Sequence, residues 1–272
     1  MKTLFFILFT LTSIFLQAEH DININIFYED TENGCKIFID NKEHCPVSVK
    51  LDLVMTNLES SMGNNQIFVI PANSKKELLT ELKIKKAGKP FKWSYSYLVN
   101  YGNHNQSTYD SEYEYFLPYK KSETYEIYQG YNGTFSHKNE NSLDFSMPIG
   151  TEIIAIRGGI VIDMIQENSK NCPKEICKKY NNYILVYHSD GTFAEYAHIK
   201  KNGSKVKIGE KINQGQIIGY SGNVGWSSGP HLHLVVFLQK LNERKTLETK
   251  FLTEGGEKSE YLKEKKKYSR NY

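Results

Sequence analysis

The chain has little net charge, and this excludes one large class of proteins. Its 34 lysines and arginines nearly balance 31 aspartates and glutamates, so the formal net charge is only +3. A nucleic-acid partner is not indicated, because proteins of that class concentrate positive charge on one face. The basic residues gather instead in 263–270, where we expect a solvated tail. Attraction of this segment to an anionic wall polymer is the alternative.

Long apolar runs are also scarce, and the clearest one lies at the start of the sequence. Residues 4–16 are apolar apart from two threonines and a serine, and they follow a short basic start and end before Ala18. This pattern predicts a secretory signal peptide over 1–18, because the run is too short to span a bilayer. An uncleaved membrane anchor is the alternative. We therefore expect a monomer that is exported to the periplasm or beyond and leaves the membrane after cleavage.

Cysteine is scarce as well, with four residues in the chain. Cys35 and Cys45 bracket a predicted strand and turn, whereas Cys172 and Cys177 bracket a short loop. Four cysteines allow three pairings, and we favour the local one because each pair lies within a single loop or hairpin. Such short loops remove little entropy from the unfolded chain, so these disulfides would fix loops and not the whole fold. A zinc cluster of four thiolates is disfavoured by the spacing and by export.

Sustained helical periodicity is the last scarce feature, and we therefore expect an all-β chain. In 19–117 the alternation of apolar and polar residues predicts a small antiparallel β-sandwich. Residues 118–127 are predicted to be a linker. From 128 to 250, short strands separated by glycine-rich turns predict a folded antiparallel sheet. Residues 251–272 would supply a closing segment and the basic tail.

Two strand pairs are predicted inside the C-terminal part. The dipeptide Asp190-Gly191 separates the runs 183–188 and 192–198, which is a strong hairpin signal. The runs 151–157 and 159–163 are predicted to be adjacent strands.

The most informative motif is His231-Leu232-His233, at the start of an apolar run rich in β-branched residues. Side chains alternate between the faces of a strand, so both imidazoles would project from one side, away from Leu232 and Leu234. Two neighbouring imidazoles are costly to bury and pack poorly. They are explained if one holds a metal and the other acts beside it.

Three residues elsewhere in the sequence could complete such a site, namely His137, Asp144 and His198. A catalytic zinc takes three ligands of the histidine and carboxylate type and leaves a fourth position open. His137, Asp144 and one of the paired histidines would supply these ligands. The other paired histidine and His198 could then act on a substrate. Solitary histidines are usually surface or core residues, as we expect for His20, His44, His104 and His188.

Taken together, these motifs resemble the lysostaphin-type zinc metallopeptidases, the LytM-like and LasA-like enzymes that cut peptidoglycan peptides. The resemblance covers about residues 128–240. It implies one Zn²⁺ per chain, with His137, Asp144 and His233 as its ligands, and a catalytic pair that does not bind the metal, His198 and His231. His231 would be the general base for the attacking water. His198 would donate a hydrogen bond to the oxyanion or a proton to the leaving amine.

The chain departs from the family pattern between the first histidine and the aspartate. Many members place these two residues closer together, whereas residues 138–143 intervene here. We expect these residues to enlarge the rim of the site. If His137 were displaced, Glu140 would be the nearest spare carboxylate.

The resemblance implies a secreted endopeptidase that hydrolyses peptide bonds in peptidoglycan stems or cross-bridges. A non-catalytic wall-binding or amidase-activating protein on the same fold is the alternative, but the presence of all five site residues favours the enzyme. A third hypothesis gives the N-terminal domain the main role, as a binding module or a plug. Glycyl-glycine bridges and D-amino-acid cross-links are both open as substrates.

Overall fold

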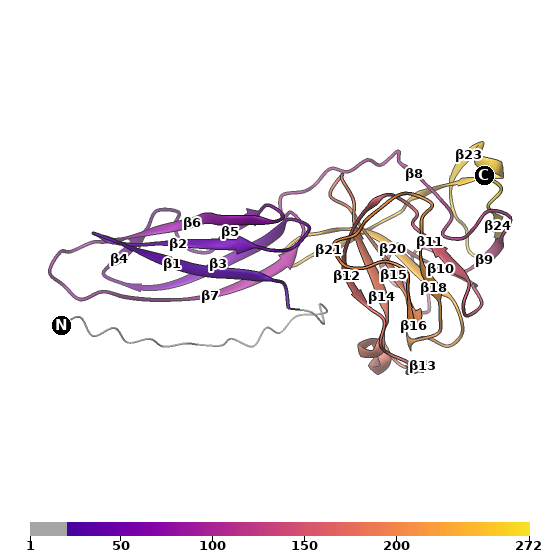
Figure 1. The fold of residues 1–272 in the computed structure, drawn as a ribbon, viewed down its shortest axis with the longest axis horizontal. Coiled ribbons are helices and arrows are strands. Elements are labelled where there is room, and N and C mark those ends of the chain that lie inside the picture. Colours follow the sequence, from indigo (N-terminus) through magenta and orange to yellow (C-terminus); the bar gives the residue numbers. More distant parts are fainter. Residues whose placement is uncertain (1–20) are drawn as a thin grey trace.

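The computed structural model describes residues 21–272, and this part of the chain consists almost entirely of β-strands (Figure 1). Its helical segments are two short 3-10 turns, η1 (Glu175–Tyr180) and η2 (Glu254–Gly256). Neither could cross a membrane. The all-β prediction is confirmed. The signal peptide predicted for 1–18 lies outside the described residues.

The N-terminal part folds as two facing antiparallel sheets, as predicted. The first has the order β1-β2-β6-β4 and the second β5-β3-β7. Their strands are β1 (Ile24–Thr31), β2 (Gly34–Asn41), β3 (Val47–Thr56), β4 (Leu58–Ser60), β5 (Gln66–Ile70), β6 (Ser74–Ile84) and β7 (Lys92–Tyr101). Val47, Val49 and Leu51 of β3 are buried against Ile37 and Ile39 of β2 in one apolar cluster. The alternation along β3 thus places one of its faces in the core.

The C-terminal part is organised around a nine-stranded sheet with the order β17-β12-β14-β15-β20-β10-β9-β24, and β21 also pairs with β20. The strands of this sheet are β9 (Thr124–Gln129), β10 (Ser142–Phe145), β12 (Gly159–Ile165), β14 (Tyr183–Tyr187), β15 (Phe193–Ala197), β17 (Lys211–Ile212), β20 (Leu232–Gln239), β21 (Arg244–Leu247) and β24 (Lys267–Ser269). Smaller sheets flank it, formed by β8 (Glu114–Tyr115), β11 (Glu152–Ile154), β13 (Asn171–Cys172), β16 (Ile199–Ser204), β18 (Ile217–Ser221), β19 (Gly225–Trp226), β22 (Lys250–Thr253) and β23 (Lys258–Tyr261).

The two strand pairs predicted in this part have different outcomes. The hairpin around Asp190-Gly191 is present, because β14 and β15 pair in antiparallel fashion along their full length. The pairing of 151–157 with 159–163 is wrong, because β11 pairs with β18 whereas β12 pairs with β14 and β17. The chain passes from one sheet to the other between these strands. Ala155 there bonds to the backbone of Gly215 and Gln216 and not to β12.

The segments expected as a linker (118–127) and a solvated basic tail (263–270) are instead built into the C-terminal fold. Tyr119 is fully buried, and its hydroxyl donates a hydrogen bond of 2.6 Å to the carbonyl of Tyr268, which is itself buried. Strand β24 pairs with β9 and completes one edge of the large sheet. The many lysines around Tyr268 concealed this buried strand in the sequence.

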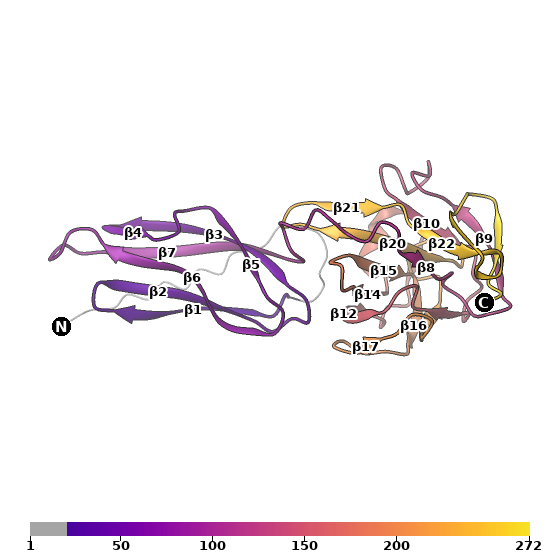
Figure 2. The same cartoon turned by 90° about the horizontal axis from the view of Figure 1, so that it is seen from above.

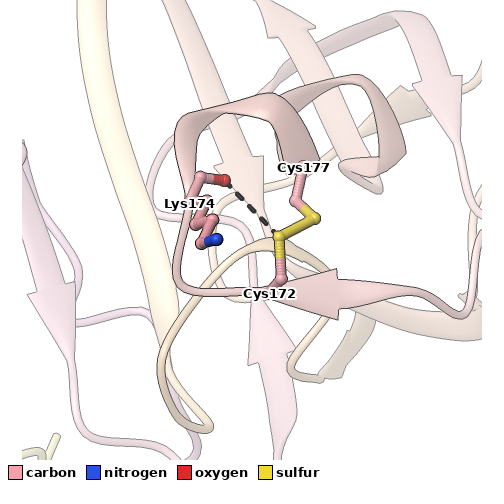
Figure 3. Close-up of a disulfide and its surroundings, with 3 residues drawn as sticks. All are labelled: Cys172, Lys174 and Cys177. Atoms are coloured by element: carbon pink, nitrogen blue, oxygen red, sulfur yellow. Dashed lines mark hydrogen bonds between the residues drawn. A yellow bond between two sulfur atoms is a disulfide. The ribbon is translucent and has the colours of Figure 1, made fainter.

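One of the two predicted disulfides is present in the described residues, between Cys172 and Cys177 (Figure 3). Cys35 and Cys45 are buried free thiols, so the prediction of a bridge between them is wrong. Cys35 lies at one end of β2, whereas the carbonyl of Cys45 accepts a hydrogen bond from the side chain of Asn41 at the other end. The intervening strand is about 20 Å long at roughly 3.3 Å per residue. A disulfide spans only about 4.4–6.8 Å between Cα atoms.

The end of the N-terminal sandwich packs against one face of the nine-stranded sheet (Figures 1 and 2). Phe193 of β15 and Val235 and Phe237 of β20 belong to the same apolar cluster as the sandwich core. The backbones approach closely at Gly102, which has φ +88° and where a Cβ atom would lie 2.6 Å from the carbonyl oxygen of Gln239. Only glycine fits such a contact. The opposite face of the sheet carries a separate apolar core.

Candidate active site

The alternation of β20 separates the two histidines from the leucines beside them. Leu232 and Leu234 are buried in the core of the C-terminal part. His231 and His233 project from the other face and line a cleft. The motif therefore places two imidazoles side by side at the start of one strand, on the face of the sheet opposite the core that contains Leu232 and Leu234.

Strand pairing brings a carboxylate to the same point. Strand β10 pairs with β20 in a register that sets Asp144 directly opposite His233. The Oδ1 atom of Asp144 lies 2.9 Å from Nδ1 of His233 and 3.2 Å from Nε2 of His137. Those two nitrogens are 3.2 Å apart. All three residues thus converge on one point, although His137 comes from a loop and not from a strand.

This arrangement fits a tetrahedral metal ion. One donor atom from each of His137, Asp144 and His233 lies within 4.8 Å of the others. Ligands at about 2.1 Å from a tetrahedral zinc are about 3.4 Å from one another, close to the separations observed. Two imidazoles and one carboxylate form a donor set suited to zinc with a fourth position open.

Hydrogen bonds fix which nitrogen of His137 faces the other two residues. Its Nδ1 atom lies 3.0 Å from the carbonyl oxygen of Gly130 and donates to it. The lone pair therefore resides on Nε2, which faces Asp144. A backbone carbonyl as the outer partner of an imidazole is typical of metal sites, because it fixes both tautomer and ring orientation.

Gln129 links the loop of His137 to Asp144 and was not identified from the sequence. Its side-chain oxygen accepts hydrogen bonds from the backbone N–H groups of Phe135 and Ser136. Its side-chain nitrogen donates 3.1 Å to Oδ2 of Asp144. A single buried amide thus holds the loop and the carboxylate in a fixed relation. In the sequence, Gln129 is only a glutamine before a glycine-rich loop, and this pattern is too common to predict its role.

His198 and His231 lie beside the three converging residues. Their ring centroids are 4.5 Å apart, and that of His198 is 6.0 Å from the ring of His233. His231 donates from Nδ1 to the carbonyl of Gly229 at 2.8 Å, which leaves a lone pair on Nε2, 3.7 Å from Asp144 Oδ1. His198 makes the equivalent bond of 2.7 Å to Val224. Both rings therefore direct an unprotonated Nε2 away from the backbone that fixes them.

Backbone strain also marks His198. It follows β15 with φ +63°, a left-handed conformation that non-glycine residues adopt at a cost. Its backbone N–H group donates a hydrogen bond of 3.3 Å to the side-chain oxygen of Asn181. The strain and the bonds to Asn181 and Val224 together aim its imidazole at His231.

The buried charges of the site shift one another's pKa values. Burial opposes ionisation of Asp144, but the neighbouring imidazoles of His137 and His233 hold the pKa of its carboxyl well below the usual range. Burial also opposes protonation of His233, yet the hydrogen bond to Asp144 and the nearby carboxylate of Glu140 raise its pKa above the ordinary value. Asp144 and His233 thus share a proton as an ion pair. A divalent cation would take the place of that proton.

The other two histidines are shifted in the opposite direction. Burial, reinforced by the charges of His231 and His233, lowers the pKa of His198 to about 3. Burial likewise lowers the pKa of His231, although Asp144 partly opposes the shift. Both imidazoles are therefore neutral at pH 7, and each can accept a proton.

The cleft above these residues has a volume of about 360 Å³. Aromatic side chains border it, namely Tyr128, Phe135 and Trp226. Pro173 and Lys178 also line it, and each is the neighbour in sequence of a cysteine of the Cys172–Cys177 disulfide. All the lining residues lie between 128 and 246, so no described residue of the N-terminal sandwich enters the cleft.

The five site residues expected from the sequence are thus brought together, and the remaining histidines lie elsewhere. His188 is fully buried and bonds to the carbonyl of Gly158. His44 packs against Gly209, and His104 bonds to the backbone of Leu241 between the two parts of the chain. His20 lies outside the described residues. Glu140, first considered as a spare ligand, faces Nε2 of His233 at 3.7 Å.

Comparison with known proteins finds a family similarity in the C-terminal part. Residues 138–244 match the model of peptidase family M23. The match begins one residue after His137 and includes the other four site residues.

Two curated relatives each match less than half of this chain. A peptidoglycan DD-endopeptidase, ShyA of Vibrio cholerae, is 38% identical over 93 residues, which are 34% of this chain and 19% of the relative. A glycyl-glycine endopeptidase, ALE-1 of Staphylococcus capitis, is 35% identical over 117 residues, which are 42% of this chain and 28% of the relative. The chain therefore spans well under half of the length of these relatives.

Among solved structures, the catalytic domain of lysostaphin from Staphylococcus simulans aligns with a TM-score of 0.33 at 26% identity. The alignment covers 46% of this chain and 88% of that domain.

Proposed function

We propose that this chain, which carries a domain of peptidase family M23, hydrolyses peptide bonds in the stem or cross-bridge peptides of peptidoglycan. The observation that carries this proposal is the convergence of His137, Asp144 and His233 beside two neutral histidines in an open cleft. The printed names of ShyA and ALE-1, which describe peptidoglycan endopeptidases, support the substrate class.

In this proposal, one Zn²⁺ is held by Nε2 of His137, Oδ1 of Asp144 and Nδ1 of His233. Zinc in such a site supplies Lewis acidity to a carbonyl oxygen and lowers the pKa of water to about 7. Gln129 and Gly130 would keep the first two ligands in place through the bonds described above.

His231 is proposed as the general base. Its Nδ1–H group is engaged with Gly229, so Nε2 is free to remove a proton from water beside Asp144. Its lowered pKa keeps Nε2 unprotonated at neutral pH. The ring centroid of Tyr128 lies 6.3 Å from that of His231, and Tyr128 would shield His231 from bulk water.

His198 is proposed to act on the oxyanion or the leaving amine. Because its Nδ1–H group is engaged with Val224, it can donate from Nε2 only after taking up a proton. With a pKa lowered to about 3, that proton is absent in the resting site. His198 would therefore receive, during the reaction, the proton that the neighbouring His231 removes from water, and pass it on to the leaving amine.

Metal analysis and digestion of a defined substrate test the proposal. The mature protein should contain one zinc per chain and release soluble fragments from purified peptidoglycan, and a chelator should abolish this release. Mass spectrometry of digested muropeptides would identify which bond is cut. A protein that contains no stoichiometric metal, or that binds peptidoglycan without cutting it, would instead support the non-catalytic wall-binding or amidase-activating alternative.

The protein is proposed to act outside the inner membrane, in the periplasm or the extracellular space, as a monomer. The signal peptide predicted for 1–18 supports export, and the disulfide between Cys172 and Cys177 is the type of bond that persists in oxidising compartments. Mass spectrometry of the protein recovered from outside the cytoplasm should show an N-terminus near residue 19. An intact Met1 would contradict cleavage.

The N-terminal sandwich is proposed to support the sheet and not to plug the cleft, because none of its described residues lines the cleft. A fragment that begins near Thr108, and so keeps Tyr115, Leu117 and Tyr119 of the C-terminal core, would test this. A plug predicts that the fragment is more active than the full chain, whereas a support predicts that it is less stable and less active.

A further inference from the structure

We propose that Glu140 is a positioning residue that holds His233 in the orientation and tautomer in which it binds the metal. The inference rests on the proposed zinc-dependent function. Its starting observation is that His233 has a carboxylate on each side. Asp144 Oδ1 lies 2.9 Å from Nδ1, and Glu140 Oε1 lies 3.7 Å from Nε2.

The chemistry of imidazole gives the second carboxylate a role. If Nδ1 of His233 binds a metal, the ring proton must reside on Nε2 and needs an acceptor. Glu140 presents its carboxylate to that nitrogen. Glu140 is not among the donor atoms that converge in the described part of the chain, which come from His137, Asp144 and His233. It therefore orients a ligand and is not a ligand itself.

The loop between His137 and Asp144 holds Glu140 in a defined conformation. The N–H group of Glu140 donates to the carbonyl of His137, and its own carbonyl accepts from the N–H group of Asn132, both at 2.9 Å. The next residue, Asn141, donates from its backbone to Oγ1 of Thr246 at 2.8 Å and from its side chain to the carbonyl of Thr246 at 3.2 Å. Strand β21 thus anchors the loop. The long insertion accordingly supplies a fixed carboxylate and does more than enlarge the rim.

Zinc affinity provides the direct test. Loss of an outer partner of a metal ligand usually weakens metal binding about 10- to 100-fold. We expect the zinc dissociation constant, measured by competition with a chromogenic chelator, to rise by about this factor in Glu140→Ala. Glu140→Gln keeps the shape and one acceptor oxygen, so its loss should be smaller. Glu243→Gln, which removes the same charge from the exposed turn between β20 and β21, should leave the affinity unchanged.

Nitrogen-15 NMR of the zinc-loaded protein separates positioning from a general structural role. In the wild type, His233 should carry its proton on Nε2, and this proton should exchange faster in both Glu140 variants. The Nδ1 proton of His137, which is bonded to Gly130, should not change. Equal zinc affinity in the wild type and Glu140→Gln and Glu140→Ala would overturn the proposal. A wild-type protein that binds no zinc would overturn the proposed function instead.

Discussion

The two halves of strand β20 differ in function although they share one face. His233 projects into the cleft, whereas Val235 and Phe237, two and four residues further along, are buried against the N-terminal sandwich. The same side of one strand thus lines the cleft at His233 and forms an apolar interface within a few residues. The difference shows that the sandwich covers the part of this sheet face that does not line the cleft. Stability and chemistry can therefore be altered separately along a single strand.

The largest predicted effect comes from the cleft half of this face. His231→Ala should lower kcat/KM about 10²- to 10⁴-fold, because it removes the proposed general base, while one zinc per chain is retained. His233→Ala should lose both the activity and the zinc. Steady-state assays on a defined muropeptide, combined with metal analysis, distinguish the two variants. Loss of zinc in His231→Ala would assign that residue to the metal instead.

The second prediction concerns the interface half. Phe237 is 3% exposed and stacks on Phe193 with ring centroids 5.4 Å apart. Phe237→Ala should lower the free energy of unfolding by about 3–5 kcal/mol, because it opens a cavity between the sandwich and the sheet. Denaturant unfolding measures the loss. Zinc content at temperatures where the variant is folded should not change, and a variant that loses zinc while folded would show that the two halves are coupled.

The third prediction compares a histidine outside the cleft with those inside it. Burial lowers the pKa of His188 from 6.5 to about 4, so the unfolded chain binds a proton between these pH values that the folded chain does not. Stability should therefore fall as the pH falls from 6.5 to 4, by about 3 kcal/mol from this residue. His188→Asn retains a donor for the carbonyl of Gly158 and should reduce this dependence. Unfolding curves at several pH values would test it; identical slopes in both proteins would contradict the assignment.

The pH dependence of catalysis should follow the cleft histidines. His231 must be neutral to act as a base, and its pKa lies below the ordinary value of 6.5. The value of kcat/KM should therefore persist below pH 6.5 and fall only at more acidic pH. A pH–rate profile with parallel zinc analysis separates protonation of His231 from loss of the metal. An acidic limb at or above pH 6.5 would argue against His231 as the base.

The smallest effect is expected at the disulfide of the cleft wall. Reduction of the bond between Cys172 and Cys177 should loosen the loop that carries Pro173 and Lys178, and KM should rise a few-fold with kcat nearly unchanged. The double variant with serine at both positions is the matched control and should not respond to reductant.

Alkylation tests the assignment of Cys45 as a buried free thiol. Cys45 should resist alkylation in the native protein.

Much of the site could be predicted from the sequence because its parts follow local rules. Strand alternation alone places His231 and His233 on one face, and Asp190-Gly191 marks the hairpin that ends at His198. The continuous apolar run after His233 also indicates that this strand is buried on both faces, because such strands are apolar at every position. That run corresponds to the half of β20 that the sandwich covers.

The remaining features depend on contacts between residues far apart in the sequence. Glu140 acquires its importance only because strand pairing brings His233 beside it, and Gln129 only because its loop folds back onto Asp144. The prediction for Cys35 and Cys45 failed because a straight strand separates residues that are close in sequence. The buried strand at Tyr268 was concealed by its charged neighbours.

The pairing of β9 with β24 has a consequence for the timing of synthesis. Thr124 and Ser269 meet across this pair, yet they are 145 residues apart in the sequence. Strand β9 also lies next to β10, which carries Asp144. On the ribosome, this edge of the sheet stays open until residues 267–269 have been translated. The order of translation thus delays completion of the proposed hydrolase until Ser269 has been added to the chain.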